Sequence, residues 1–426
     1  MLKTELFCKA QDFNNGSGPA WSHGNSPIVR HGDRVFCTNS RVIPGREPFN
    51  HTSMELYEKR GDGPWERVFC DGGVFQREPC PVVLAGDKLL VTVNPTARAY
   101  APDEPSRVVP CTPMLYVFDV SGEVRLEKRL PMPWDTNTYN FLDHSYRGGA
   151  VDAVTGDVFF DNLHYPPESE GEHIYALLDK ELNTLYTRDL VFPERVCYHT
   201  AAVRGGEAYV FGVQDIVEPN RVWLDYKRQV TGQEWDYDFR SIWMKYTPDI
   251  RTRDFGAAER VCDREATCGW TDNLDCCYTA DGAMLLAVRE QNVHQAFMRD
   301  HFFPQEKLYS RLSVFRFAGG VLQEKFVVDE AGEENGTAAA YGALFHTAAD
   351  GSVYLAWSKE GGESGLAAGT YLMPFATRES RYLCPQTGTL FGSKTRLGAA
   401  PDDRMDLLWY TKKELIYGSF DLSAEK

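Results

Sequence analysis

The sequence predicts an all-β protein, a seven-bladed β-propeller whose ring is closed by a strand from the N-terminus. Three observations lead to this fold: hairpin units recur along the whole chain, most units are followed by a second hairpin, and the last unit is short of strands. Units of this kind are stable when each sheet buries a face against the next around a ring. We therefore expect residues 1–426 to form a single propeller domain.

Each repeating unit has an apolar strand, a turn rich in glycine and aspartate, and a second apolar strand. In one unit, for example, the apolar runs VVLA and LLVTV flank the segment Gly86-Asp87-Lys88. Turn residues of this kind between two β-rich runs are a strong hairpin signal. The first hairpins of the blades are expected at residues 26–36, 80–91, 141–164, 198–211, 275–288, 345–357 and, more weakly, 405–420.

A second hairpin of more alternating pattern follows most units, as in residues 115–124 and 312–321, so each blade has four strands. Because the last blade lacks a strand at the C-terminus, residues 2–10 are expected to supply one and close the ring. Helices are almost absent from the pattern, and residues 292–307 are the strongest exception. Two stacked β-sandwich domains are the alternative fold, but they do not explain the repeat.

The composition is that of a folded protein with a sizeable core, because 43% of the residues are hydrophobic and 25% are charged. The net charge of -16 argues against nucleic acid or an anionic membrane as the main partner, since both reward clustered Lys and Arg. An anionic substrate remains compatible with this charge, because a few local cations are enough to bind it. No run approaches the roughly 18 apolar residues of a membrane span.

The compartment is inferred from the N-terminus and the cysteines. The stretch MLKTELFCKAQDFNNG has no apolar core and no small-residue cleavage site of a secretory signal. The 11 cysteines are odd in number and scattered along the chain, unlike a disulfide framework. We expect free thiols and a cytoplasmic protein.

In a propeller, the innermost strands line the axis and the loops before them form a shallow cup on one face. Residues at the start of each blade's first strand therefore converge although they are far apart in the sequence. This rule brings together Arg77 of blade two, His144 and His164 of blade three, Tyr198 and His199 of blade four, and residues 270–273 of blade five.

Two histidines lie at the ends of the central hairpin, residues 141–164. Because the hairpin folds back at its glycine turn, His144 and His164 are expected to face one another. Imidazole or phenolate takes a proton, and phenol or imidazolium gives one, so the two histidines and Tyr198 form a coherent acid–base set. The alternatives are ordinary loop histidines and a core tyrosine.

Several further histidines and one arginine carry weaker signals. His199, in Tyr-His-Thr, has a counterpart in His346, in the Phe-His-Thr of blade six, and this repetition favours a structural role for both. Arg289 and His294 follow the blade-five hairpin and either reach over the cup or belong to a solvated loop. His23 lies at the start of blade one and offers a catalytic histidine for a different reaction.

Signatures of metal and nucleotide sites are weak or missing. Zinc-type ligands occur without CxxC or HxxxH spacing, so a structural zinc is a minor alternative; they are Cys268, Cys276, Cys277, His294 and His301. The sequence has no G-x-S-x-G elbow, no P-loop and no H-E-x-x-H. Residues 61–65 are only a fragment of a sialidase Asp-box, which argues against a sialidase.

The central hairpin resembles a motif of a known enzyme group. Asp143-His144 at its start, the turn Thr155-Gly156-Asp157 and His164 at its end are similar to the BNR-type seven-bladed propellers that include the ulvan lyases. The resemblance implies that His144, His164 and Tyr198, which opens the next blade's hairpin, act on a uronic acid.

This chain departs from the family pattern at two places. The family's arginine would fall near Val213 or Gln214, where there is none, and Ser145 stands where an asparagine is usual. Arg221 or Arg289 is the expected substitute for the lost cation.

The implied reaction is β-elimination at a 4-linked uronic acid. A proton alpha to the carboxylate must leave, so cations or hydrogen bonds must offset the carboxylate charge while a base and an acid flank the sugar. Tyr198 and His144 are expected as the base and acid, and His164 with one of the two arginines as carboxylate neutralisers. No redox or metal cofactor is required by this scheme.

We therefore expect an enzyme, a lyase that cleaves uronate-containing oligosaccharides. The expected catalytic residues are His144, His164 and Tyr198, and the expected substrate-binding residues are Arg77, Arg147, His199, Arg221, Trp270, Arg289 and His294. Two alternatives remain: a glycoside hydrolase that removes rhamnose from glucuronate with His23, and a propeller that binds glycans or a protein without catalysis. Fold alone does not choose among them.

Overall fold

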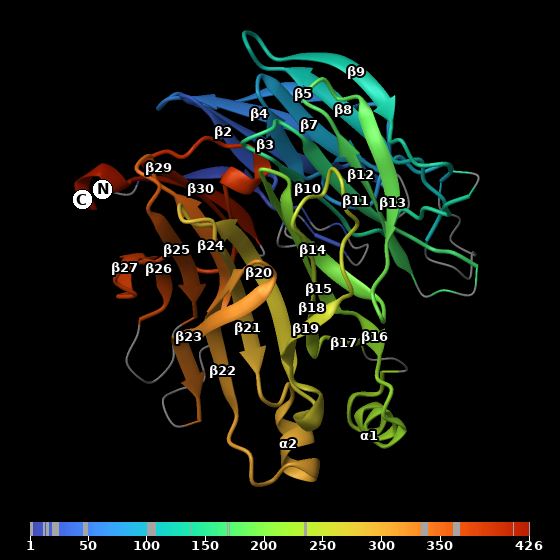
Figure 1. Cartoon of the computed structure of the whole chain (residues 1–426), viewed down its shortest axis with the longest axis vertical. Helices are drawn as coiled ribbons and strands as arrows, with labels where there is room; N and C mark the ends of the chain where they lie inside the picture. Colours follow the sequence, from blue (N-terminus) through green and yellow to red (C-terminus); the bar gives the residue numbers. More distant parts are fainter. Residues whose placement is uncertain are drawn as a thin grey trace.

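Seven four-stranded antiparallel sheets follow one another around a ring in this computed structural model, and the colours of Figure 1 change in order around it. The seven-bladed β-propeller expected from the hairpin repeat is therefore confirmed. The structure describes residues 3–425 apart from positions 12, 14–16, 19–24, 46–49, 100–107, 137, 168, 170, 234–236, 334–339, 361–366 and 412.

In six blades the strands pair in sequence order from the axis outward. Blade one has β2 (Ile28–His31), β3 (Arg34–Val42), β4 (Thr52–Arg60) and β5 (Trp65–Cys70); blade two has β6 (Val82–Ala85), β7 (Lys88–Val93), β8 (Met114–Asp119) and β9 (Arg125–Pro131). Blade three has β10 (Arg147–Val151), β11 (Val158–His164), β12 (Glu172–Leu178) and β13 (Thr184–Leu190). Blade four has β14 (Val196–Arg204), β15 (Glu207–Gln214), β18 (Ser241–Thr247) and β19 (Glu259–Asp263). Blade five has β20 (Trp270–Tyr278), β21 (Met284–Gln291), β22 (Tyr309–Ala318) and β23 (Val321–Gly332); blade six has β24 (Ala340–Thr347), β25 (Val353–Lys359), β26 (Gly369–Pro374) and β27 (Arg381–Cys384).

Blade seven contains both ends of the described chain. Its strands are β28 (Thr389–Gly392), β29 (Arg404–Tyr410), β30 (Glu414–Asp421) and, outermost, β1 (Lys3–Lys9). β1 pairs antiparallel with β30, with Lys3 opposite Ser419 and Lys9 opposite Glu414. The N-terminal strand thus closes the ring, as the sequence predicts.

The inner strands form a closed circle of neighbours. β2 contacts β6, and the contacts continue through β10, β14, β20, β24 and β28 back to β2. Hydrophobic clusters lie between adjacent sheets; Val83 and Phe160, for example, share the cluster between blades two and three. The short helix η2 (Thr395–Leu397) contacts β6, β10, β14 and β20, so it lies at the axis of the ring.

One expected hairpin proved to be shifted by one strand. The weak unit at residues 405–420 forms β29 and β30, which are the second and third strands of blade seven, and the axial strand is β28. β28 has only four residues, TLFG, and the segment that contains η2 separates it from β29. So short a strand followed by a long connection carries little hairpin signal.

Two α-helices extend from one side of the ring, at the bottom of Figure 1. α2 (Ala296–Phe302) lies within the region where the sequence predicts a helix, whereas α1 (Arg221–Thr231) was not expected. α1 begins at Asn220, whose side chain accepts hydrogen bonds from the backbone of Val222 and Trp223, and it ends at Gly232 in a left-handed conformation. These are standard helix start and stop signals.

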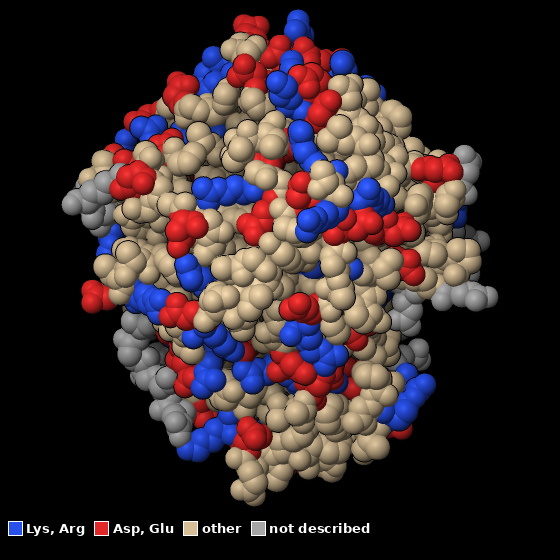
Figure 2. Space-filling model, in the orientation of Figure 1, with Lys and Arg blue, Asp and Glu red and all other residues tan. Residues whose placement is uncertain are grey.

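The remaining short elements are a two-stranded ribbon of β16 (Ile216–Val217) and β17 (Tyr237–Asp238) and the helices η1 (Glu265–Thr267) and η3 (Leu422–Glu425). None of the described helices is long and apolar enough to cross a membrane. All 11 cysteines are free thiols, as expected. Figure 2 shows basic and acidic side chains interspersed over the visible face, without a broad basic field.

Candidate functional site

Aromatic and imidazole rings form a continuous arc across blades three to five. We call it the aromatic arc; its members are His144, Tyr146, Tyr198, Phe239, Trp270 and His294. Its residues lie just before inner strands, at the start of inner strands, or in the connections between second and third strands. All these positions are on the same face of a propeller, which we call the upper face.

Neighbouring rings of the arc are in contact. Ring centroids are 6.2 Å apart for His144 and Tyr146, 4.9 Å for Tyr146 and Tyr198, and 6.1 Å for Tyr198 and Phe239. The arc continues with 4.4 Å between Phe239 and Trp270 and 4.2 Å between Trp270 and His294. Four expected site residues, His144, Tyr198, Trp270 and His294, are thus brought into one group.

Tyr198 departs from regular strand geometry. Its φ of 51° is in the left-handed region, and the pairing of β14 with β15 shifts between Cys197 and Thr200. A bulge of this kind turns a side chain out of the alternation of the strand, and bulges are common beside functional sites. The Tyr198 ring consequently joins the arc instead of following the neighbouring residues.

His144 forms an ion pair or hydrogen bond with a buried acid of blade two. Its Nδ1 lies 2.5 Å from Oε1 of Glu78, and the His144 side chain is 27% exposed whereas that of Glu78 is 1% exposed. When Nδ1 carries the proton and donates to Glu78, the lone pair of the imidazole is on Nε2. Arg77, another expected site residue, lies beside this pair, with Nε 3.6 Å from Glu78 Oε1.

Asp143 is a second buried acid of this group. Burial raises the pKa of its carboxyl to about 6, although the backbone N–H of Val109 and the charge of Arg77 act in the opposite direction. Asp143 therefore changes its charge near neutral pH, which is where groups that exchange protons in catalysis are usually tuned.

Burial, together with an acid behind the two tyrosines, keeps them protonated. Burial raises the pKa of Tyr198 well above its usual value, and Cys197 and Asp215 raise it further. Asp215 accepts a hydrogen bond from Tyr146 and pairs with Arg195, whose Nη2 lies 2.9 Å from Asp215 Oδ2. Tyr198 is therefore a neutral phenol near pH 7 and is suited to donate a proton.

At the blade-five end of the arc, Asp272 joins two expected site residues. Nε1 of Trp270 donates to Asp272 Oδ2 at 2.8 Å, and Nη2 of Arg289 donates to the same oxygen. The Arg289 side chain is 23% exposed and that of Asp272 2%. The indole and the guanidinium are thus held together by one buried carboxylate.

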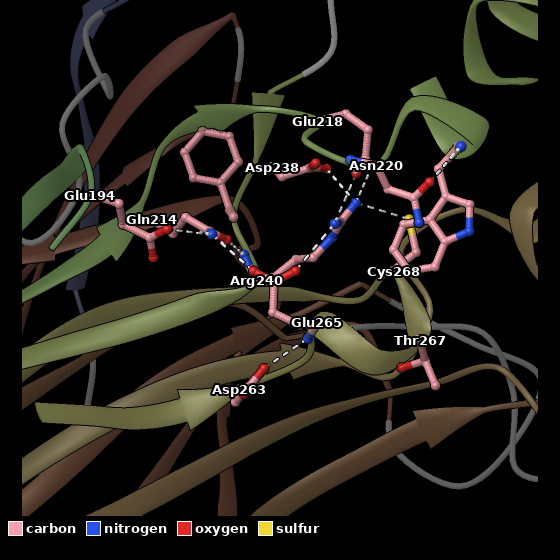
Figure 3. Close-up of polar contacts among 12 residues, drawn as sticks. Glu194, Gln214, Glu218, Asn220, Asp238, Arg240, Asp263, Glu265, Thr267 and Cys268 are labelled. Carbon is pink, nitrogen blue, oxygen red and sulfur yellow. Dashed lines mark hydrogen bonds and ion pairs between the residues drawn. The ribbon is translucent and has the colours of Figure 1, made fainter. Parts of the chain in front are cut away.

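A buried charge cluster supports the middle of the arc (Figure 3). Arg240, next to Phe239, donates from Nη1 to Glu218 at 3.2 Å, and its Nη2 lies 2.9 Å from Asp238 Oδ1. Lys227 of α1 lies 3.0 Å from Glu218 and 3.1 Å from Asp238. The cluster joins α1 to the strands of blade four, so α1 and Phe239 are held as one unit.

Gln214, one of the two positions near which the family resemblance would place an arginine, belongs to this support. Its amide donates to Glu194 at 3.0 Å and to Glu265 at 2.9 Å, and its oxygen accepts from the backbone N–H of Arg240 at 3.0 Å. The position is 1% exposed, so it holds Arg240 in place. The arginine of the family pattern has no direct replacement there.

His164 lies in different surroundings from His144. It ends β11, the second strand of blade three, with its ring 4.8 Å from Tyr139 and 6.1 Å from Phe141. Burial lowers its pKa, and neither ring nitrogen has a hydrogen-bond partner among the described residues. His144 instead contacts Glu78 and Tyr146.

Two other expected substrate-binding arginines are outside the arc. Arg147 opens β10 and is buried; its Nη2 donates to the carbonyl of Pro79 at 2.7 Å. Arg221 is the first residue of α1 and is exposed to solvent. Of the two proposed substitutes for the family arginine, only Arg289 contacts a residue that is itself bonded to the arc.

His199 and His346, taken as counterparts in the sequence, lie at different levels of their strands. Thr347 is the last residue of β24 and pairs with Val353 beside the turn, whereas Thr200 pairs with Phe211 and β14 continues to Arg204. The expectation that they occupy corresponding places is wrong. His199 is buried against Asp161 and His173, and His346 against the carbonyl of Asp402.

The cysteines considered as zinc ligands are dispersed. Cys276, Cys277 and Cys268 belong to three different hydrophobic clusters, and His301 stacks on Tyr226 at 4.1 Å. In the part of the chain that the structure describes, one group of three residues has ligand atoms close enough to hold a metal ion: Asp161, His173 and His199. His23, the histidine of the hydrolase alternative, lies outside the described residues.

Sequence reasoning missed four residues that shape the site: Tyr146, Arg195, Asp215 and Phe239. The first three lie within three residues of an expected site residue or of the position where the family arginine was sought. The end of each blade's second strand lies on the same face as the start of its first strand. Counting those positions as candidate site residues would have included Asp215. No local sequence signal marks Phe239 as a site residue, because its position depends on the neighbouring Arg240, which is held by residues distant in the sequence.

Comparisons with known proteins were made for the sequence and for the fold. No protein-family profile matches the sequence, and no curated protein matches it. Among solved structures, an ulvan lyase of a new polysaccharide lyase family, bound to -[GlcA(1-4)Rha3S]-, is similar over 99% of this chain and 98% of its own, with a TM-score of 0.56 and 10% identity. A second structure of such an ulvan lyase has a TM-score of 0.51 at 10% identity, over 99% and 98% of the two chains. These likenesses show a shared propeller fold.

Proposed function

We propose that this protein is a carbohydrate-active enzyme, a lyase that cleaves a uronic-acid-containing oligosaccharide by β-elimination at the aromatic arc. The observation that carries the proposal is the arrangement of the His144–Glu78 pair and the Tyr198 phenol on the two sides of Tyr146. The similarity of the fold to an ulvan lyase bound to a glucuronate-containing saccharide supports the choice of substrate class.

In the proposed reaction His144 is the base and Tyr198 the acid, the reverse of the roles expected from the sequence, because burial keeps the Tyr198 phenol protonated. Its Nδ1–H is held by Glu78, so Nε2 accepts the proton from the sugar carbon alpha to the carboxylate. The electron pair of that C–H bond forms the new carbon–carbon double bond, and the bond from C4 to the leaving oxygen breaks. Glu78 stabilises the imidazolium that results, as a carboxylate does in other histidine–carboxylate pairs.

Tyr198 is the acid of the proposed reaction. Because burial keeps its hydroxyl protonated, it is able to give its proton to the leaving glycosidic oxygen as the bond breaks. Tyr146 and Asp215 behind it offer a route by which the phenol recovers a proton. The sum is one proton taken and one given, with no change in oxidation state and no cofactor.

Arg289 is the cation that we assign to the substrate carboxylate. It is partly exposed, and Asp272 orients it next to Trp270, whose ring offers a face for a sugar. The guanidinium would lower the energy of the carbanion-like transition state by offsetting the growing charge on the carboxylate. Arg221, exposed on α1, is the second candidate.

The test is to incubate the full chain with glucuronate- and iduronate-containing oligosaccharides and to follow ultraviolet absorbance from a 4,5-unsaturated product. We expect absorbance from the wild type, no comparable rate from His144→Ala, and a raised KM for Arg289→Ala. New reducing ends without absorbance would contradict the lyase and favour the hydrolase alternative. Saccharide binding without any product would contradict catalysis and favour a binding propeller.

A further inference from the structure

Two histidines and one aspartate meet between blades three and four, behind the aromatic arc. Asp161 is on β11, His173 on β12 and His199 on β14, and their side chains are at most 1% exposed. One ligand atom from each residue lies within 4.8 Å of those of the other two. We propose that Asp161, His173 and His199 bind a divalent transition-metal ion, with Zn²⁺ as the preferred occupant, which links blades three and four.

The distances suit such an ion. Nδ1 of His199 lies 2.7 Å and Nδ1 of His173 3.4 Å from Oδ2 of Asp161, and the two ring centroids are 3.5 Å apart. Zinc bonds of about 2.0–2.2 Å at tetrahedral angles separate neighbouring ligand atoms by about 3.3 Å. The His173 distance already fits, and the His199 distance requires an opening of about half an ångström.

The hydrogen bond of His173 is the one expected around a metal ligand. Nε2 of His173 lies 3.1 Å from the carbonyl oxygen of Val196, so this nitrogen carries the hydrogen and donates it. The lone pair of His173 is then on Nδ1, which faces the carboxylate of Asp161 without a hydrogen between them. Two buried electron-rich atoms in this position need a cation, and an outer N–H bonded to a backbone carbonyl is typical of a metal-bound imidazole.

Two glycines, Gly148 and Gly212, lie against the group and leave room for its side chains. A Cβ at Gly148 would lie 2.7 Å from Oδ1 of Asp161, and a Cβ at Gly212 would lie 2.8 Å from Cδ2 of His199. Any other residue at either position would push the acid or the imidazole aside. The two glycines therefore preserve the geometry of the three side chains.

A cavity gives the group a path to solvent. It has a volume of about 270 Å³, and its lining includes His173, Glu172, Glu194 and Val196. An ion is able to enter from this side, and water in the cavity supplies a fourth ligand. Two imidazoles with one carboxylate and an open position are a donor set that zinc accepts.

The proposed ion would act on the arc through the backbone. His199 directly follows Tyr198, and the bulge of β14 lies between Cys197 and Thr200. Fixing His199 to two strands of blade three therefore fixes the left-handed turn that presents Tyr198. The proposal does not depend on the lyase reaction, because a metal at this place would support any function of the arc.

The test uses the untagged full chain, stripped with a chelator and titrated with ZnCl₂ alone. We expect one Zn²⁺ per chain, a Tm raised by several degrees, and binding at least about 100-fold weaker in His173→Gln and Asp161→Asn. His346→Gln is the matched control, since His346 is also a buried imidazole but its Nε2 bonds the backbone carbonyl of Asp402 instead of a carboxylate. It should bind as tightly as the wild type.

X-ray absorption of the Co²⁺ form of the wild type keeps the test decisive even when a variant does not fold. Two nitrogen ligands in the first coordination sphere would support the site. An all-oxygen sphere, absence of stoichiometric Zn²⁺, or wild-type affinity in folded His173→Gln would overturn it and leave a hydrogen-bonded His–Asp–His group.

Discussion

Blades four and six carry the same pattern, aromatic–His–Thr, in their inner strands, yet the structure uses it at opposite ends. In β14 the pattern lies toward the upper face, where Tyr198 joins the aromatic arc. In β24 it lies beside the hairpin turn, and Phe345 is a core residue that is 2% exposed. A shared aromatic–His–Thr pattern, identical at two of its three positions, therefore did not predict equal placement.

The turn lengths explain the difference. β14 and β15 are joined by Gly205 and Gly206 alone, both with positive φ, whereas Ala348 to Ser352 separate β24 from β25. A two-residue turn with two positive φ values is the tight hairpin connection, so β14 continues almost to the glycines. Height along a blade is thus set by where the turn begins, and this decides which side chains reach the upper face.

The largest effects should come from substituting the two aromatic residues of these patterns, Tyr198 and Phe345. Tyr198→Phe should lower turnover by roughly 10²-fold or more with Tm nearly unchanged, because it removes a proton donor and little packing. Phe345→Ala should instead cost about 3–5 kcal/mol of unfolding free energy while activity per folded molecule is kept. Steady-state rates and urea unfolding measure the two.

Tyr382→Phe, at an exposed tyrosine of blade six, is the control for loss of a hydroxyl and should change neither quantity. A Tyr198→Phe variant with wild-type turnover would remove Tyr198 from the mechanism.

A second test compares how stability depends on pH for two buried titratable residues, Asp143 near the aromatic arc and His346 near the turn of blade six. Asp143 is taken first. Burial raises its pKa from 3.8 to about 6, so the folded state binds the extra proton between these values. Stability is therefore lost as pH rises from about 4 to about 6, by up to about 3 kcal/mol. Asp143→Asn should be more stable than the wild type at pH 7 and about equal at pH 4.

Unfolding free energies measured by denaturant at several pH values check this. An Asp143→Asn variant that is less stable than the wild type at pH 7 would contradict it.

His346, at the turn end of blade six, should respond with the opposite sign. Burial lowers its pKa below 6.5, so the unfolded chain takes up the proton first as pH falls. Its contribution to stability is present above that value and is lost below it. His346→Gln should flatten the stability profile of the wild type between pH 7 and pH 5, as thermal unfolding in a buffer series will show. An unchanged slope would show that His346 does not titrate in this range.

The smallest expected effect is a difference in unfolding free energy between alanine substitutions in the two turns. Gly206 and Gly351 both have positive φ, 89° and 84°, so alanine at either should cost about 1–2 kcal/mol. A Cβ at Gly206 would also lie 2.9 Å from Oδ1 of Asp249, whereas at Gly351 the nearest atom is 3.6 Å away. Gly206→Ala should therefore be the more destabilising of the pair in urea unfolding. Equal costs would mean that Asp249 moves freely.

The propeller could be predicted because its signals are local. Turn chemistry and apolar runs repeat in each blade, and the closing strand β1 follows from a missing strand at the other end. β28 was missed because four residues carry little pattern. α1 was missed although Asn220 and Gly232 mark its ends, because it is a single short helix in a chain of otherwise repeating hairpins.

The candidate site could be predicted only where it follows the strand-start rule. His144, Tyr198 and Trp270 obey that rule and lie on the arc. The hairpin pattern does not predict two further contacts, that of His144 with Glu78 from blade two and that of His164 with Tyr139 from the loop before β10. Such contacts between distant segments leave no trace in a single sequence.

The pairing of β1 with β30 also delays the last step of folding until almost the whole chain has been synthesised. Lys3 pairs with Ser419, so β1 cannot pair until the ribosome has made the residues between them. At about 5–20 residues per second this takes roughly 20–80 s. Six blades have the time to form before the seventh is complete, and closing the ring means ordering a loop that spans the whole propeller. During that wait β1 is a free strand, and its alternating Lys3, Glu5 and Lys9 disfavour pairing with a neighbouring chain. The charges on this outermost strand thus protect the nascent protein in the interval before it becomes a ring.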